Sequence, residues 1–222
     1  MAVIRRIEPR DVEGVAACMV ACKGSMFGGV TGMRLWRAMA GDAAKGQLLC
    51  CVAVEDEKIV AACIAASRHF HWAFLLRHPV LSAEILWHRL KEKFGSKEPV
   101  QTDRTGPLPE EIFKYVSREK PPMTWNHCPG ADRALFTGTL HEYRGRHIAA
   151  GLKQAMARES ERPLVGRISA YNVISVRSNH AGGWKMWLDG DSNVVAIKYP
   201  DRGAQTSAET NTQVAAAQPN VK

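Results

Sequence analysis

Two apolar runs of strand length, 48–54 and 59–66, flank the charged tetrapeptide 55–58. Each run is too short to cross a bilayer, and the charged residues between them prevent the two from joining into one span. So short and polar a connection between two apolar runs is typical of an antiparallel hairpin. The sequence therefore predicts a sheet protein and argues against a membrane-spanning one.

The other apolar segments follow either the two-residue period of strands or the three-to-four-residue period of helices. Further strands are expected at 3–7, 134–140, 164–170, 184–188 and 192–199. Helices are expected from Pro9 onward and around 33–40, 80–94, 110–118, 148–156 and 174–180. This order of elements predicts an α/β or α+β fold in which a mixed sheet carries helices on its faces.

One stretch interrupts the regular order between the predicted third and fourth strands. Residues 69–130 are rich in proline, histidine and aromatic residues, and we expect an insertion of helices and loops there. Residues 1–200 are expected to form a single domain that includes this insertion. Residues 201–222 are almost without large apolar side chains, which predicts a disordered tail.

The charge of the chain favours an anionic partner. The 30 Lys and Arg residues outnumber the 22 Asp and Glu residues, which gives a net charge of +8 at pH 7. This excess does not distinguish a phosphorylated cofactor from a nucleic acid. The six cysteines lie mostly in apolar segments and are expected to be reduced and buried. The N-terminal segment lacks the apolar core of a signal peptide, so we expect a cytoplasmic protein without a membrane partner.

The most informative segment is 139–152, in which a strand ends, a basic turn follows and a helix begins. The first amides of a helix have no intrahelical acceptor, and the helix dipole adds partial positive charge there. Arg144 and Arg146 in the turn reinforce this charge, and Gly145 lets the backbone approach a ligand closely. The segment predicts a pyrophosphate site, although such a turn is also common at ordinary solvated helix starts.

The element order and two motifs resemble the GCN5-related N-acetyltransferase (GNAT) superfamily. The turn and helix start from Arg144 to Ala149 are similar to the family signature, with His147 where glycine is usual. Asn172, Ser175 and the pair Gly183-Trp184 follow the second family motif, but Asn179 stands where a tyrosine is usual. The resemblance covers residues 3 to 199 and implies a mixed, mostly antiparallel sheet.

The resemblance also implies a cosubstrate, acetyl-CoA or another acyl-CoA, in a V-shaped gap between the fourth and fifth strands. Its pantetheine arm would follow the fourth strand, whose backbone would be freed by a bulge. The residues implied in this binding are Thr137, Thr139, Arg144, Gly145, Arg146, His147, Ile148, Ala149, Asn172 and Ser175. The insertion would lie on the side of the acceptor, a small amine such as an amino sugar or an amino-acid derivative.

The proton-transfer groups that such a reaction needs are less clear from the sequence. Asn179 can hydrogen-bond a sulfur atom but cannot transfer a proton, whereas the neighbouring His180 could do both. Asp132 and His141, at the two ends of the fourth strand, are candidate bases, as are Glu55 and Glu57 in the hairpin turn. For each of these four candidate bases, a plain turn or loop residue is the stronger interpretation.

Two other functions remain open at this point. The positive charge and the aromatic insertion would also suit a protein that binds or modifies nucleic acid. His147 and Asn179 would suit an acyltransferase-like protein that binds CoA without turnover. The histidines of the insertion lack the paired spacing of zinc ligands, so we expect no metal. The sequence leaves the oligomeric state open, a homodimer included.

Overall fold

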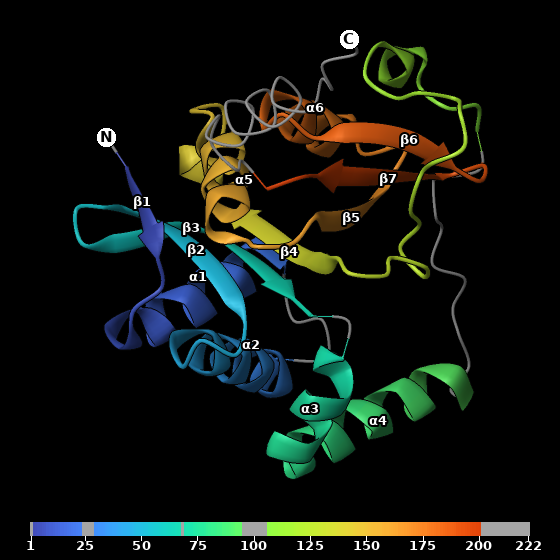
Figure 1. Ribbon diagram of the computed structural model, residues 1–222. Helices are drawn as coiled ribbons and strands as arrows, with labels where there is room; N and C mark the ends of the chain where they lie inside the picture. Colours follow the sequence, from blue (N-terminus) through green and yellow to red (C-terminus); the bar gives the residue numbers. More distant parts are fainter. Residues whose placement is uncertain (1, 24–28, 68, 95–105, 201–222) are drawn as a thin grey trace, which may run out of the picture.

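The protein is built around a single seven-stranded sheet (Figure 1). The structure is a computed structural model, and it describes residues 2–23, 29–67, 69–94 and 106–200. The strands are β1 (Val3–Arg6), β2 (Leu49–Glu55), β3 (Lys58–Ala66), β4 (Asp132–Thr139), β5 (Leu164–Ser169), β6 (Lys185–Asp189) and β7 (Asn193–Lys198). Their order is β1-β2-β3-β4-β5-β7-β6; β4 pairs in parallel with β5, and all other neighbouring strands are antiparallel. The predicted mixed, mostly antiparallel sheet is confirmed.

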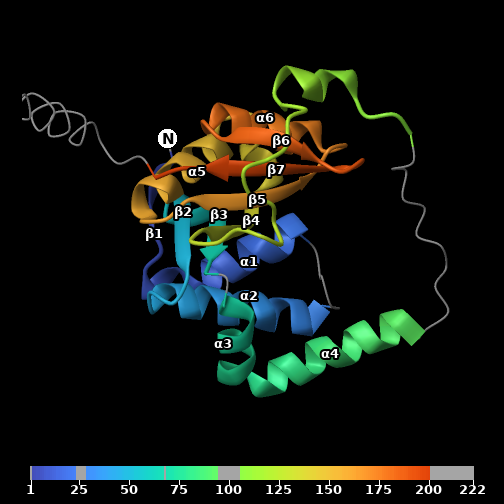
Figure 2. The ribbon, with the colours of Figure 1, turned by 45° about the vertical axis from the view of Figure 1, so that its right-hand side comes forward.

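Helices cover both faces of the sheet (Figure 2). The α-helices are α1 (Val12–Lys23), α2 (Gly29–Ala44), α3 (Phe70–Arg77), α4 (Pro79–Phe94), α5 (Ile148–Glu159) and α6 (Val173–Ala181). Three 3-10 turns are η1 (Pro9–Asp11), η2 (Glu110–Lys114) and η3 (His141–Tyr143). Because successive strand residues point to opposite faces, Cys50 joins the core beneath α1 and α2, whereas Cys51 joins the core beneath α5 and α6.

The sequence predictions differ from the structure mainly at element ends. Helix α2 begins at Gly29, earlier than predicted, and α3 was not predicted at all. The hairpin between β2 and β3 is tighter than expected, with two turn residues, Asp56 and Glu57, both at positive φ (50° and 61°). The predicted disordered tail, 201–222, and residues 95–105 of the insertion lie outside the described residues.

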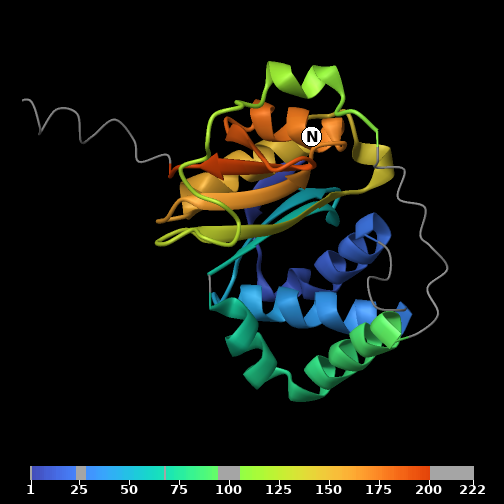
Figure 3. The same cartoon turned by 90° about the vertical axis from the view of Figure 1, so that its right-hand side faces the viewer.

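The insertion between β3 and β4 packs on both sides of the sheet. Helices α3 and α4 form the outermost layer beyond α2 (Figure 3), and Phe70 and Phe74 of α3 join the core beneath α1 and α2. Further along, η2 packs near α6, and Ser117 forms a bridge with Trp187 of β6. In the described part of the chain, every helix is too short or too polar to cross a membrane.

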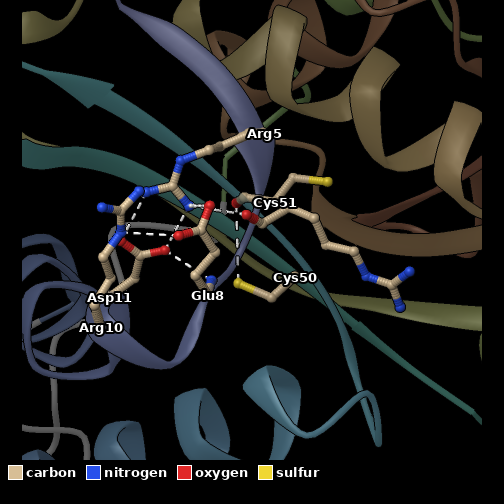
Figure 4. A network of polar contacts seen from close by, with 7 residues as sticks. Arg5, Glu8, Arg10, Asp11, Cys50 and Cys51 are labelled. Carbon is tan, nitrogen blue, oxygen red and sulfur yellow. Dashed lines mark hydrogen bonds and ion pairs between the residues drawn. The ribbon is translucent and has the colours of Figure 1, made fainter.

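A polar network fixes the junction of β1 and α1 (Figure 4). The Arg5 guanidinium donates to both carboxylate oxygens of Asp11, at 2.6 and 2.9 Å. The Glu8 amide donates to the same carboxylate at 2.7 Å, so Asp11 also closes the first turn after the strand. Asp11 is buried, and its three bonds replace the water that it loses on folding.

Candidate functional site

The strands β4 and β5 separate after three residue pairs. Pairing ends at Ala134 and Gly166, and the next residue, Leu135, is an extra residue of β4 at a register shift against β3. Beyond this bulge β4 continues along β3, and β5 continues along β7. The expected bulge and the expected gap between the two strands are therefore present, and the backbone of β4 that faces the gap is not used by β5.

A cavity of about 730 Å³, a size suited to a cofactor, lies beyond the point of separation, between β4 and the helices α5 and α6. Its walls come from the end of α1, β4, the turn before α5, and the facing sides of α5 and α6. The lining residues are Cys22, Thr137, Gly138, Thr139, Tyr143, Arg144, Gly145, His147, Ile148, Ala149, Ala150, Lys153, Asn172, Ile174, Ser175, Arg177, Ser178 and Ala181.

The first turn of α5 opens into the cavity. The first helical bond in α5 runs from the Gly151 amide to the His147 carbonyl, at 3.1 Å. The amides of Ile148, Ala149 and Ala150 therefore precede the helical ladder and can serve an anion. His147 is the N-cap residue and has a left-handed backbone (φ 59°, ψ 12°), a conformation that explains why a glycine would suit this position.

Three cationic side chains line the same cavity. Arg144 reaches back from the turn, with its Nε 3.4 Å from the Thr139 carbonyl oxygen. Lys153 of α5 is buried, and its Nζ lies 3.1 Å from Oγ of Ser178 on α6. Arg177 of α6 is exposed and ion-paired with Glu111. A cavity with these cations and with helix amides at one end is suited to a ligand that carries several phosphate groups.

Lys153, Arg177 and Ser178 were not predicted from the sequence. Lys153 lies four residues after Ala149, and Ser178 lies three residues after Ser175. Helical spacing therefore places both Lys153 and Ser178 beside a predicted residue. That spacing was a usable signal. It did not separate a cavity lysine from the many surface lysines, because burial depends on the packing of α5 against α6.

Most residues predicted to bind the cosubstrate come together around the cavity. Thr137, Thr139, Arg144, Gly145, His147, Ile148, Ala149, Asn172 and Ser175 all line it. The Oγ1 of Thr137 lies 2.9 Å from Sγ of Cys63. Asn172 also has a structural role, because its side chain caps α6 by accepting the Ser175 amide at 3.0 Å.

Arg146 departs from the prediction. Its guanidinium lies 3.3 Å from the Glu55 carboxylate and stacks over the ring of Tyr143, and it is not among the cavity-lining residues. The two arginines diverge because Gly145 between them has a left-handed backbone (φ 82°). The ion pair also occupies Glu55, a candidate base, while Glu57 lies at the tip of the β2–β3 turn.

The four residues predicted for catalysis do not line the cavity. Asp132 begins β4, at the end where β4 and β5 still pair; burial raises its pKa, opposed by Arg162 at 3.9 Å. His141 is exposed in η3. The Asn179 side chain bonds the Ser175 carbonyl within α6, at 2.7 Å, and His180 packs against Tyr115. Sequence proximity to β4 and α6 was therefore a poor guide to the position of these side chains.

No group of three or more His, Cys, Asp or Glu side chains that could hold a metal ion occurs within the described residues. The histidines of the insertion are dispersed there. His78, for example, lies 3.2 Å from the Asp42 carboxylate, beside Arg77, and serves the packing of α3 on α2.

Comparison with solved structures identifies the fold. An N-acetyltransferase from Staphylococcus aureus superposes with a TM-score of 0.52 at 15% sequence identity, covering 89% of this chain and 100% of that one. NAA60 from Arabidopsis thaliana, crystallised with acetyl-CoA, superposes with a TM-score of 0.50 at 12% identity, covering 90% of this chain and 98% of that one. No protein-family model matches the sequence, and no curated protein matches it significantly. The expected GNAT fold is confirmed.

Proposed function

We propose that this protein is an acyl-CoA-dependent N-acyltransferase that uses acetyl-CoA and transfers its acetyl group to a primary amine. One observation carries the proposal: beyond the point where β4 and β5 separate, a large cavity lies between β4 and the helices α5 and α6, and the free amides of α5 open into it. The fold is shared with proteins named N-acetyltransferases, one of them crystallised with acetyl-CoA, which supports the same assignment.

The cavity matches the chemistry of CoA from one end to the other. The pyrophosphate would lie on the amides of Ile148, Ala149 and Ala150 beside Arg144. The pantetheine arm would follow β4 past Thr139 and Thr137, where extended backbone beside the gap can pair with its amides. Lys153 lies five residues further along α5, about 7.5 Å from Ile148 along the helix axis. It would therefore contact the arm rather than the pyrophosphate.

The reaction would be direct attack of a neutral amine on the thioester carbonyl carbon, followed by departure of the CoA thiolate. Backbone amides of β4 near the bulge at Leu135 would stabilise the developing oxyanion. A thiol has a pKa of about 8.5, so the thiolate can leave without a dedicated acid. The proton of the attacking amine must go to a base or to water, and Asp132, His141, Asn179 and His180 remain the residues predicted for catalysis, although none of them lines the cavity. A small acceptor, such as an amino sugar or an amino-acid derivative, remains the proposed substrate class.

Thermal unfolding with and without acetyl-CoA tests the binding, because a ligand that binds only the folded state raises the melting temperature. Dephospho-CoA and free pantetheine, compared at equal concentration, should stabilise progressively less as phosphates are removed. Release of free thiol with a panel of amines tests turnover. Stabilisation without thiol release from any amine would favour a CoA-binding protein that lacks activity. Absence of stabilisation, together with salt-sensitive retention on DNA or RNA, would favour the nucleic-acid alternative.

A further inference from the structure

The outward side of α3 and α4 carries an apolar surface that is exposed among the residues the structure describes. We call it the α3–α4 surface, and its residues are Trp72, Leu75, Leu76, Val80, Leu86, Trp87 and Leu90. Trp72 is 73% exposed, Leu76 82% and Trp87 59%. These two helices form the outermost layer of the molecule beyond α2, so this surface faces away from the sheet and from the cavity (Figure 3).

The pattern of the two helices shows that this surface is not a chance exposure. In α3, Phe70 and Phe74 point into the core, while Trp72, Leu75 and Leu76 lie on the opposite side at helical spacing. In α4, Leu81 is buried, whereas Val80, Leu86, Trp87 and Leu90 are exposed. A helix that is apolar on both sides is normally covered on both sides, and a group of neighbouring exposed apolar side chains often marks a binding site.

The charges around the surface identify what would cover it. Residues 69–94, up to the end of α4, contain four Lys or Arg residues and four His residues against two acids, Glu84 and Glu92. Glu84 is tied to Arg34 of α2 and is thereby held on the inner side of α4. Lys91 lies over the ring of Trp87, with its Nζ 5.2 Å from the ring centroid. The surface thus combines exposed indoles and leucines with the net positive charge of the two helices that carry it.

We propose that the α3–α4 surface docks on an anionic lipid membrane, with the two helices lying in the plane of the interface. Tryptophan prefers the depth of the lipid headgroups, and lysine can place its stem along apolar surface while its ammonium contacts anionic headgroups. Amphipathic helices that bind membranes show this division between an apolar side and nearby basic residues. The net charge of +8 adds long-range attraction to such a surface.

A second copy of the chain is a poorer match to the same features. In a two-fold dimer the same surface lies on both sides of the interface, so net positive charge would face net positive charge with no excess of acid to balance it. An anionic bilayer supplies that missing negative charge. The proposal does not depend on the proposed acetyl transfer, because lipid binding can be measured without acetyl-CoA.

Co-sedimentation of the full chain with lipid vesicles tests the proposal. We expect binding to vesicles of equal phosphatidylglycerol and phosphatidylcholine and weaker binding to phosphatidylcholine alone. Binding to the anionic vesicles should be weaker at 0.5 M than at 0.1 M salt, because added salt shortens the Debye length from about 10 Å at 0.1 M. The triple variant W72Q/L76Q/W87Q should lose on the order of tenfold or more in partitioning, because it removes three apolar side chains that would enter the interface.

The variant V3Q/Y199Q is the matched control, because Val3 and Tyr199 are also exposed apolar residues but lie away from α3 and α4. It should bind vesicles as the unmodified chain does, and all three proteins should keep the same melting temperature. The proposal is overturned if the unmodified chain does not bind anionic vesicles, or if the triple variant binds them equally. A dimer in light scattering that the triple variant converts to a monomer would assign the surface to a second copy and would also overturn it.

Discussion

The guanidinium of Arg146 lies 3.3 Å from the carboxylate of Glu55 and 5.0 Å from the ring centroid of Tyr143. This contact ties the turn before α5 to the hairpin of β2 and β3, on the outer side of the cavity. Arg144, two residues earlier, turns the other way and lines the cavity. Two arginines that the sequence places together therefore have different roles.

This divergence makes the two arginines a matched pair for mutation. Arg144→Ala should weaken acetyl-CoA binding about tenfold, because it removes a charge-assisted contact to the phosphates. Arg146→Ala should change the affinity by less than about threefold, because an exposed ion pair contributes little. Isothermal titration calorimetry on both variants measures the difference. Equal losses in the two variants would show that Arg146 leaves Glu55 to bind the ligand.

Lys153 provides a second test, inside the cavity. Lys153→Met keeps the length and the burial of the side chain but removes its charge, so the fold should be retained. We expect acetyl-CoA to bind on the order of tenfold more weakly, since a hydrogen bond from a charged group contributes about 1.5–3 kcal/mol. Lys185→Met, on an exposed residue of β6, is the control and should bind normally. Unchanged affinity in Lys153→Met would mean that this ammonium serves only the contact between α5 and α6.

The turn before α5 could be predicted from sequence because all of its signals are local. The end of β4, the left-handed glycine and the apolar face of α5 follow one another within about fifteen residues, and each follows a known backbone preference. The burial of Lys153 could not be predicted, because it depends on α6, twenty residues further along the chain. Helix α3 was missed for a similar reason: Phe70, Trp72, Phe74, Leu75 and Leu76 are apolar on both sides of the helix and show no single period.

The residues predicted for catalysis stay predictions, and the structure places them at different ends of β4 and on α6. Asp132 and His141 both flank β4 in sequence, but the strand between them is eight residues long, which separates its ends by roughly 25 Å. Sequence position alone does not tell which end of a strand opens into a ligand site. Asn179 was considered for its amide, yet in α6 that amide satisfies the Ser175 carbonyl one turn earlier.

His147 offers a prediction about stability at the same turn. A residue with a side chain in the left-handed region costs about 1 kcal/mol relative to glycine. His147→Gly should therefore raise the free energy of unfolding by about 0.5–1 kcal/mol. Gly145→Ala is the reverse experiment. Gly145 has a φ of 82°, and a Cβ at this position would meet no atom within 4 Å, so the substitution adds only backbone strain. We expect this variant to lose about 1 kcal/mol. Denaturant titration measures both, and a destabilised His147→Gly would show that the imidazole makes a contact that outweighs the strain.

The network at the start of α1 predicts how the protein responds to acid. Burial alone would raise the pKa of Asp11, but the hydrogen bonds from Arg5 and from the Glu8 amide outweigh it, and the pKa is lowered. A carboxyl whose folded-state pKa is lowered stabilises the protein fully above its unfolded-state pKa, about 3.9, and loses this contribution as the pH falls through the lower folded-state value. Asp11→Asn should cost about 2 kcal/mol at pH 7 and flatten the loss of stability below pH 4.

Urea titrations between pH 7 and pH 2 measure this dependence. Glu13→Gln is the control, since Glu13 pairs with Arg37 on the exposed side of α1, where solvent screens the interaction. Its stability curve should follow that of the unmodified chain. If Asp11→Asn showed the same fall in stability below pH 4 as the unmodified chain, the acid sensitivity would come from other carboxyl groups. The bonds between Arg5 and Asp11 would then fix the geometry of the β1–α1 junction without making its stability depend on pH.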